Sequence, residues 1–578
     1  MVITHNANFE NQAAPRWDLA PALPVEIDQA LQQYPDYLRH ILYNRGMRDA
    51  AAAESFLAAR SPFTTDPFLL TGMAAAVQRM AQAVQAHEKV AVYGDYDVDG
   101  VTAAVLMVEV LRAAGAEVQV KIPNRFEEGY GLNNDAIQKL AEEGVRLVVT
   151  VDCGARSPRE ADLARSLGVD LIISDHHQPG AELPNVVALI NPRQPGDLYP
   201  DKDLAGVGLA YKLAEAYLQQ HAINGVKAEQ WLDLVALGTV ADMAPLTGEN
   251  RALVTQGLQQ IRAQTRQGLS SLAGAASLEI KRTTSRDIGF VLAPRLNAAG
   301  RLESAQAAFD LLATHDFNLA GKLAQDLGNQ NYERQRLTKE IQQQAAEIAL
   351  RDNPQAMLLF AVHPDFNEGV IGLAAARLVD SFYRPAIVAT RGLETTRGSC
   401  RSIPEFHITE ALDQCTELLV RHGGHKAAAG FTVRNENLDA LVAKLQAIAL
   451  TQLGNLDLRP VLKADCELPL EALGNQSTET LFAYLEKLQP NGMGNPEPVF
   501  LAKNLAVKKF KTVGKDGSHL QLTVLDAYGA MHDAIAFRQS QWVQAMPARV
   551  DLLYALEKDE YYGTPRVKLN VKGIRPAG

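Results

Sequence analysis

Three aspartates stand at alternate positions where an apolar run ends. They are Asp95, Asp97 and Asp99 in the stretch VAVYGDYDVDG (90–100), and a helical pattern follows directly. Like charges this close together repel one another unless a cation joins them. Their spacing therefore raises the question of a metal site.

Further acidic and imidazole side chains follow other apolar runs. Asp152 follows LVVTV, Asp175-His176-His177 follows LIIS, and Asp242 ends a run that we expect to be a helix leading into a turn. Carboxylates that converge with histidine have the composition of a site for two divalent ions. Carboxylates suit Mg²⁺ and imidazole favours ions such as Mn²⁺, so we expect one of these two. Two such ions can activate water and stabilise a leaving oxygen, which predicts hydrolysis at phosphorus.

Each of these residues also has a simpler interpretation. Asp99 could cap the helix that follows it, and a histidine after a buried strand is often a core or capping residue. Three acidic strand ends together favour a metal site, and two successive histidines beside Asp175 favour ligation by at least one of them. The other could orient the phosphate or protonate the leaving oxygen, and the sequence does not decide which. Asp175, His176 and His177 are therefore the candidate catalytic residues.

The elements around these residues predict a modular α/β protein. From Lys89, short apolar runs alternate with helical patterns, which is typical of βαβ units in a parallel sheet. Ligands bind such sheets at the carboxyl ends of the strands, where the acidic residues stand. Helical patterns then dominate, and the last is long enough to be a connector helix. A smaller α/β unit and a β-rich tail follow. The expected domains are a helical lead-in (1–80), the parallel-sheet α/β domain (81–318), the connector helix (319–352), the smaller α/β domain (353–455) and a small all-β barrel or sandwich (456–578).

Composition adds limits on location and partners. The chain has 578 residues with a formal net charge of −11, so a nucleic-acid partner requires a local basic surface. We find no apolar run of about 18 residues and no signal core in MVITHNANFENQ, so we expect a cytoplasmic protein with no membrane contact. Its four cysteines lie far apart with no CxxC pair, which fits a reducing compartment.

Candidate substrate-binding residues are basic, aromatic or glycine-rich. Arg125 and Phe126 form a basic and aromatic pair on a loop after a strand, although an exposed loop with one packed Phe is an equal alternative. Two arginines flank what we expect to be a small-residue turn in PRLNAAGR (294–301), and the asparagine within it could add a donor. Two glycines precede an alanine run that we expect to be helical in RHGGHKAAAG (421–430), which suits an anion or close packing. The further candidates are Arg295, Asn297, Arg301, Ser399, Arg401, Gly423, Gly424, His425, Lys508, Lys509 and Lys511.

The ordered motifs resemble a known superfamily. GDYDVDG, VDCG, SDHH and TVAD follow the order of the DHH phosphoesterases, which are named for the triplet present here as Asp175-His176-His177. Within that superfamily the chain is similar to the RecJ family of single-strand-specific exonucleases over nearly its whole length. The matching stretches are PNRFEEGYGL (123–132), LAGVGLAYKL (204–213), LVALGTVADMAPL (234–246), PRLNAAGRL (294–302), RHGGHKAAAGF (421–431) and GNPEPVF (494–500).

The resemblance implies roles for the acidic residues. Asp97, Asp99, Asp152, His176 and Asp242 would be the principal ligands of two divalent metal ions, Mn²⁺ or Mg²⁺. Asp95 and His177 would be further ligands or would support the ligands. Several relatives carry histidine where this sequence has Tyr93, so Asp95 is either a substitute ligand or a turn residue.

The resemblance also implies an activity. It predicts a 5′→3′ exonuclease that acts on single-stranded DNA with a free 5′ end and releases 5′-mononucleotides during DNA repair and recombination. It further implies a DHH-associated (DHHA1-type) second α/β domain, an oligonucleotide-binding (OB) barrel, a monomer, and a helicase and a single-strand-binding protein as partners. One alternative is a DHH phosphodiesterase for short oligonucleotides or cyclic dinucleotides, whose relatives are shorter and lack the tail. Another is a non-catalytic single-strand-binding replisome scaffold, which predicts lost ligands.

Overall fold

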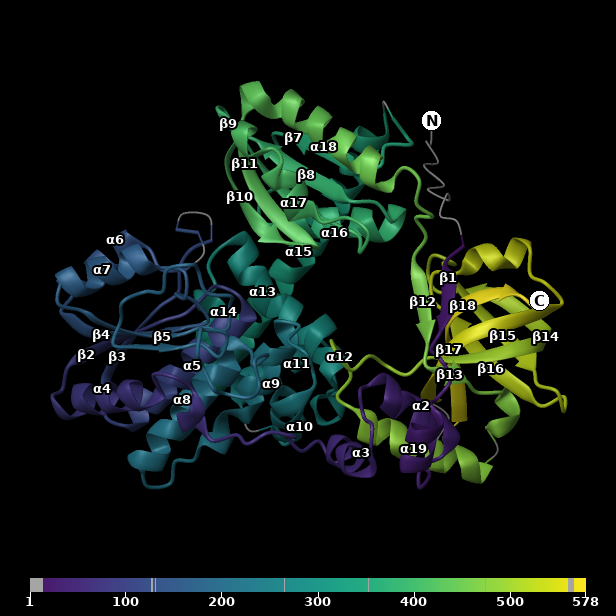
Figure 1. Ribbon diagram of the computed structural model, residues 1–578, viewed down its shortest axis with the longest axis horizontal. Helices are drawn as coiled ribbons and strands as arrows, with labels where there is room; N and C mark the ends of the chain where they lie inside the picture. The colour runs from purple at the N-terminus through teal and green to yellow at the C-terminus, as the bar shows by residue number, and fades with distance from the viewer. Residues whose placement is uncertain are drawn as a thin grey trace. The chain divides into compact units, whose positions relative to one another are not determined.

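The computed structural model describes residues 14–125, 128–129, 131–264, 266–351, 353–473, 475–559 and 566–578 (Figure 1). The chain divides into two compact units, and each is described by itself. One consists of Met1–Asp18 and Asn331–Leu462, and the other of Leu19–Gln330 and Lys463–Gly578.

The larger unit contains the predicted parallel sheet. Its five strands are all parallel, in the order β3-β2-β4-β5-β6. The strands are β2 (Lys89–Tyr93), β3 (Glu117–Lys121), β4 (Val145–Val151), β5 (Asp170–Ser174) and β6 (Ala188–Ile190). Helices cover both faces, so the central strands are apolar on both sides. Val90 and Val92 belong to the larger core, whereas Ala91 and Tyr93 face a second core.

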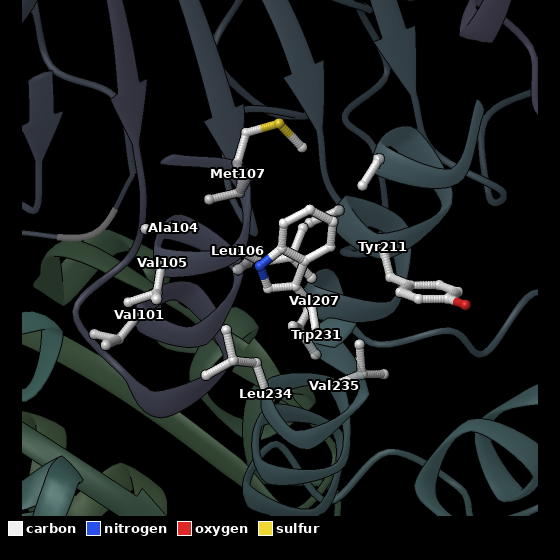
Figure 2. Close-up of a cluster of buried hydrophobic side chains, with 14 of the residues drawn as sticks. Val101, Ala104, Val105, Leu106, Met107, Val207, Tyr211, Trp231, Leu234 and Val235 are labelled. Carbon is white, nitrogen blue, oxygen red and sulfur yellow. The ribbon is translucent and has the colours of Figure 1, made fainter. Parts of the chain in front are cut away.

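The two faces are covered by different helices. Side chains of α4 (Met73–Gln85), α5 (Val98–Ala113) and α8 (Gly206–Gln220) form the larger core, and those of α6 (Asn134–Glu142) and α7 (Pro158–Ser166) form the second. Figure 2 shows Trp231 among side chains of α5, α8 and α9 (Leu232–Ala241), all of which belong to the larger core. This packing fixes the helices that begin or end beside the acidic residues.

Further helices follow α9, as predicted. They are α10 (Gly248–Arg262), α11 (Gln267–Ala275), α12 (Ser285–Asp287), a π-helical turn (Ile288–Leu292), α13 (Ala293–Leu302) and α14 (Gln306–Ala313). The stretch PRLNAAGR lies in α13, so the expected small-residue turn is wrong. Its small residues serve close helix packing instead, because a Cβ on Gly300 would lie 2.7 Å from the carbonyl oxygen of Tyr96. The connector is α15 (Phe317–Arg351), a single helix of 35 residues.

The smaller unit holds a sheet of five strands in the order β10-β11-β9-β8-β7. They are β7 (Leu359–His363), β8 (Ala386–Arg391), β9 (Thr395–Arg401), β10 (Leu419–His425) and β11 (Ala428–Arg434), with α16 (Ile371–Phe382), α17 (Ile408–Asp413) and α18 (Leu438–Leu453). The predicted helix at the alanine run is wrong, because these residues begin β11. Ala429, Phe431 and Val433 point into the core at every second position, and both edges of the strand pair with other strands.

The tail forms the predicted closed barrel. Strand β14 (Phe500–Val513) pairs with both β15 (His519–Leu525) and β17 (Arg549–Asp559), and β16 (Met531–Ala536) and β18 (Arg566–Pro576) complete the ring. The barrel strands are preceded by β12 (Val461–Ala464), β13 (Cys466–Glu467) and α19 (Asn475–Leu488).

The first elements of the chain pack with this barrel. Buried side chains of α2 (Asp36–Asn44) and α3 (Ala50–Leu57) share one core with the barrel, while α1 (Val25–Ala30) packs at its edge. Strand β1 (Arg16–Leu19) pairs with β12. Within the described ranges, no helix has the length and apolar composition needed to cross a bilayer.

Candidate metal centre

The acidic residues lie at the carboxyl edge of the parallel sheet. Strands β2, β4 and β5 are neighbours in the sheet, and Asp95, Asp152 and Asp175 follow their last residues. All three side chains are buried. The predicted convergence of three acidic strand ends is therefore present in the fold.

Asp97 and Asp99 bind different helix ends. The Oδ1 atom of Asp97 accepts hydrogen bonds from the amides of Asp99 (3.0 Å) and Gly100 (3.1 Å), so Asp97 is the N-cap of α5. The carboxylate of Asp99 accepts from the amides of Gly206 (2.7 Å) and Val207 (2.8 Å) at the start of α8. Asp99 therefore does not cap its own helix, and the simpler interpretation of this residue is wrong.

Asp152 has an unusual backbone conformation. Its φ is +62°, in the left-handed region that non-glycine residues seldom adopt. The hydroxyl of Thr150 donates to the carbonyl of Cys153 (2.7 Å), and the amide of Asp152 donates to the carbonyl of Ser174 (2.9 Å). A Cβ on Gly206 would lie 2.5 Å from Asp152 Oδ1, so only glycine permits this approach of α8.

The two histidines have different surroundings. Nδ1 of His177 lies 2.8 Å from Oδ1 of Asp175, whose other oxygen accepts from the amide of Ala155 (2.8 Å). The Nε2 atom of His176 lies 3.1 Å from Asp152 Oδ1, and 3.9 Å from one oxygen each of Asp99 and Asp242. The histidine rings are themselves adjacent, with centroids 4.4 Å apart.

The candidate ligands form three groups, and within each group the ligand atoms lie within 4.8 Å of one another. The groups are Asp95 with Asp97 and Asp152, Asp99 with His176 and Asp242, and Asp152 with His176 and His177. Asp152 belongs to two of the groups, and so does His176. The arrangement has the form of two adjacent sites joined through shared residues.

The electrostatics of the cluster favour a bound cation. Burial, and then the charge of Asp97, raises the pKa of Asp99 to about 7. Burial, and then the charges of Asp99 and Asp97, raises the pKa of Asp242 to about 8. Burial also raises the pKa of Asp95 and of Asp152 well above the usual range. A divalent ion would offset this repulsion and stabilise the charged carboxylates.

The pKa values of the two histidines shift in opposite directions. Burial lowers the pKa of His176 to about 4, so this imidazole is neutral and suited to a metal. Burial by itself would lower the pKa of His177, but the hydrogen bond and charge of Asp175 outweigh burial and raise it. Two buried atoms, Asp95 Oδ1 and His176 Nε2, make no hydrogen bond, although His176 Nε2 is 3.1 Å from Asp152. The donor set therefore fits a metal.

Tyr93 does not take part in this cluster. Its hydroxyl donates to the carbonyl of Gly131 (3.0 Å) and accepts from the side chain of Asn133 (3.1 Å) in the second core. Asp95 lies in the acidic group instead. The geometry of Asp95 is that of a ligand, and its ligation of a metal stays a prediction.

Some candidate substrate residues lie beside the loop that carries Asp95 and Asp97, here called the acidic loop. Arg125 stacks on the ring of Tyr96, 4.1 Å from its centroid, and its charge favours ionised Asp95. Oδ1 of Asn297 accepts from the amide of Val98 (3.2 Å), so α13 holds the start of α5. Phe126 lies outside the described residues.

The two arginines of α13 have separate environments. Arg295 donates to the carbonyl of Val291 (2.7 Å), and burial lowers its pKa. The charge of Arg301 acts on Tyr96, which places it near the acidic loop. Their predicted contacts with a phosphate stay predictions.

In the smaller unit, Ser399 and Arg401 lie on β9. Arg401 donates to Ser399 Oγ (3.3 Å), and burial lowers the pKa of Arg401. A Cβ on Gly372, the second residue of α16, would lie 2.8 Å from Ser399 Oγ. His425 is level with Arg401, since both pair with Ala428 from opposite sides. The other predicted residues of this set, Gly423 and Gly424, precede His425 on β10.

The predicted lysines lie on the barrel strand β14. Lys508, Lys509 and Lys511 are exposed, and Phe510 between them is 40% exposed. A pocket of about 190 Å³ is lined by Lys509, Phe510, Lys511, Gln521, Leu522 and Thr523. These lysines form a local basic surface, which a chain of negative net charge needs if it is to bind a nucleic acid.

Several contributors to the site were missed by sequence reasoning. Thr150 supports the turn at Asp152, and the amides of Gly206 and Val207 bind Asp99. The ring of Tyr96 packs against the guanidinium of Arg125. The stretch LAGVGLAYKL was noticed only as a matching motif. Its two glycines were the available signal for a close backbone approach.

Comparison with known proteins defines the class first. Residues 89–239 match the model described as "DHH family, N-terminal domain", residues 355–450 the "DHHA1 domain" and residues 464–573 the "RecJ OB domain". Together with the acidic cluster at the sheet edge, these matches define a DHH-type phosphoesterase with a C-terminal OB barrel.

Relatives over the whole chain then give the family. The chain is 37% identical to a single-stranded-DNA-specific exonuclease RecJ of Bacillus subtilis over 92% of this chain and 67% of that protein. It is 33% identical to that of Dickeya dadantii over 96% and 98%. A RecJ structure with Mn²⁺ from Thermus thermophilus superposes with a TM-score of 0.83 at 29% identity, over 97% of this chain and 80% of that one. A Mg²⁺ complex from the same source gives 0.78 at 28% identity, over 97% and 79%. This chain belongs to the RecJ family.

Proposed function

We propose that this protein is a metal-dependent exonuclease specific for single-stranded DNA, which degrades strands from the 5′ end and releases 5′-mononucleotides. The observation that carries this proposal is the cluster of buried carboxylates and His176 at the ends of β2, β4 and β5, in a chain of the RecJ family. Strand specificity, polarity and product come from the family resemblance.

Two groups of residues would hold the metal ions. Asp99, His176 and Asp242 would form one site, and Asp95, Asp97 and Asp152 the other. When bound, two Mn²⁺ or Mg²⁺ ions would supply an activated water and stabilise the leaving oxygen. Asp152 lies between the groups, 3.1 Å from His176, and is suited to join them.

His177 is suited to a different task. Asp175 fixes its ring through Nδ1 and raises its pKa, so the imidazole carries a proton more readily than a free one. Its side chain is 40% exposed, whereas that of His176 is 12% exposed. We assign His176 to metal binding, and His177 to the phosphate or to protonation of the leaving 3′ oxygen.

Cationic side chains would hold the strand. Arg125 stands beside the acidic loop, Ser399 and Arg401 form a polar pair beside Gly372, and Lys509 and Lys511 flank Phe510 on the barrel. Cations bind the phosphates of a single strand, and aromatic rings stack on its bases.

The two sequence-based alternatives have less support. A shorter DHH phosphodiesterase would not account for the OB barrel or for similarity over 96% of the chain. A non-catalytic scaffold predicts lost ligands, yet the full acidic set is present. The setting we propose is repair and recombination in the cytoplasm, by a monomer that works beside a helicase and a single-strand-binding protein.

The test uses strands labelled at either end. Asp99→Asn and Asp152→Asn should each lower the rate of nucleotide release from 5′-labelled single-stranded DNA by about 100-fold or more, because each removes charge that a metal needs. A chelator should abolish release, and blunt duplex should be cut far more slowly. Asp162→Asn, on the exposed face of α7, is the matched control and should retain full activity.

Contrary results would separate the parts of the proposal. Unchanged release by both Asn variants would refute the metal site. Release confined to 3′-labelled strands would refute the polarity, and equal rates on duplex would refute the strand specificity.

A further inference from the structure

The motif GNPEPVF has no role in the site described so far. Its first residues belong to the segment between α19 and the barrel strand β14, here called the entry segment (489–496). This segment contacts loop 243–247, which directly follows the candidate ligand Asp242. The contact connects the chain segment that leads into the barrel with the loop that follows a candidate metal ligand.

The contact is close and specific. The amide of Leu246 donates to the carbonyl of Met493 at 2.7 Å. A Cβ on Gly492 would lie 2.7 Å from a methyl of Leu246, and a Cβ on Gly494 would lie 3.2 Å from Thr247. The two glycines let the backbone of the entry segment lie directly against the loop.

Two buried side chains hold the entry segment in shape. Asn495 is 1% exposed, and its amide nitrogen donates to the carbonyls of Leu488 and Pro490, both at 2.8 Å. Arg251 is 2% exposed and donates to the carbonyls of Lys487 (2.8 Å), Leu488 (3.0 Å) and Pro490 (3.3 Å). These carbonyls include the last of α19, the negative end of the helix dipole.

Helix α10 binds the loop and the entry segment at once. Arg251 lies in its first turn, and its neighbour Asn250 donates to the carbonyl of Pro245 in the loop at 3.1 Å. Burial lowers the pKa of Arg251 to about 10, which reflects the cost of removing this cation from water, and the backbone carbonyls take the place of the lost water as hydrogen-bond acceptors. Such a buried cation holds its carbonyl partners in a defined geometry, at a cost in solvation free energy.

Asp242 depends on this loop more than the other acids depend on theirs. It is the C-cap residue that directly follows α9, and its side chain is 24% exposed, against 1% for Asp99 and 2% for Asp152. The chain turns sharply after it, with Met243 at φ +62°. Its direction is therefore set by where loop 243–247 is held.

We infer that Arg251 and Asn495 are positioning residues for the metal ligand Asp242, acting through the entry segment and loop 243–247. The inference rests on the proposed role of Asp242 as a ligand. It makes the segment that leads into the barrel a part of the metal centre's frame, and so gives the motif GNPEPVF a function.

Mn²⁺ affinity of the full-length protein, measured by titration calorimetry, tests the inference. Arg251→Lys and Asn495→Ala should each weaken binding about 10-fold, the lower end of the range for groups that orient ligands. Hydrogen exchange at the Leu246 amide in metal-free protein should be faster in both variants. The matched control is Arg79→Lys, which disturbs a partly buried arginine paired with Glu88 and Asp170 at the opposite edge of the sheet and should leave affinity and exchange unchanged.

Asp242→Asn separates the two levels of the argument. If it binds Mn²⁺ as tightly as the wild type, the proposed metal site is wrong. If it binds weakly while Asn495→Ala and Arg251→Lys retain wild-type affinity and exchange, the metal site stands and the positioning role is refuted. If Arg251→Lys fails to fold, Asn495→Ala alone decides.

Discussion

Asp152 belongs to two of the three groups of candidate ligand atoms. It shares one group with Asp95 and Asp97 and another with the two histidines, and its backbone is left-handed. Such conformations cost about 1–3 kcal/mol and persist where the surroundings hold them. The hydroxyl of Thr150 is one such constraint, since it binds the carbonyl on the far side of the turn.

Thr150→Val should therefore loosen the turn at Asp152. The variant keeps the shape but leaves the carbonyl of Cys153 without its donor, so we expect a loss of about 1–3 kcal/mol in the free energy of unfolding. We also expect weaker Mn²⁺ binding, measured by calorimetry, and recovery of both in Thr150→Ser.

A buried threonine elsewhere provides the control. Thr338 in α15 also donates its hydroxyl to a backbone carbonyl, that of Arg334, at 2.6 Å. Thr338→Val removes a comparable bond and should leave Mn²⁺ affinity unchanged. An equal loss of affinity in both variants would show that Thr150 has no particular connection to the metal centre.

At the scale of elements, the start of α8 supports the whole cluster. Its first amides bind Asp99, and Gly206 allows the helix to touch Asp152. A helix N-terminus carries partial positive charge, so α8 stabilises carboxylates that crowd one another. The helix thus both orients the ligands and offsets part of their repulsion.

Gly206→Ala should damage the metal centre, because the new methyl would overlap Asp152 Oδ1. We expect Mn²⁺ affinity to fall about 10-fold or more and nuclease activity to fall with it. Gly208→Ala lies on the same helix, and its methyl would meet Leu204 at an ordinary 3.5 Å. It should bind Mn²⁺ like the wild type, and similar losses in both variants would contradict the steric argument.

The sequence predicted elements well where apolar periodicity was strong. The alternation after Lys89 became the parallel sheet, and the connector helix begins at Phe317, two residues before the predicted position. Predictions failed where composition and tertiary context conflict: alanine favours a helix, but Ala428 and Ala429 pair with strands on both sides. In α13 the small residues of PRLNAAGR serve close packing and were mistaken for a turn.

The same contrast holds within the site. Acids after buried strands were found because parallel strands bring their carboxyl ends to one edge. The partners of Asp99 were not found, since they are backbone amides more than 100 residues away along the chain. Side-chain types cannot report which helix end a carboxylate will reach.

At the scale of the whole molecule, the basic stripe on β14 compensates for the acidic chain. The formal charge is −11, yet Lys508, Lys509 and Lys511 are exposed together around Phe510. Lys503 on the same strand is different, because it is paired with Glu467. A cation that already pairs with a carboxylate neutralises a phosphate less readily, and so contributes less to the release of counterions from DNA.

Replacing Lys509 and Lys511 together by alanine should weaken binding of single-stranded DNA and reduce its salt dependence. The slope of log affinity against log salt should become shallower by about 1.4, or 0.7 for each phosphate contact. Fluorescence anisotropy at several salt concentrations, in chelator to prevent cleavage, measures this. Lys503→Ala should leave the slope unchanged, and a slope unaltered in the double variant would exclude the stripe from DNA binding.

The shared core of the two chain ends has a consequence for biosynthesis. Leu38, Ile41 and Leu42 of α2 belong to the same buried core as barrel residues as late in the chain as Leu556 and Ile574. At ribosomal rates of about 5–20 residues per second, roughly 25–100 s pass before that partner exists. During this time the first helices must expose apolar surface or be protected by a chaperone. The core that α2 shares with the barrel therefore cannot form until the barrel strands have been made.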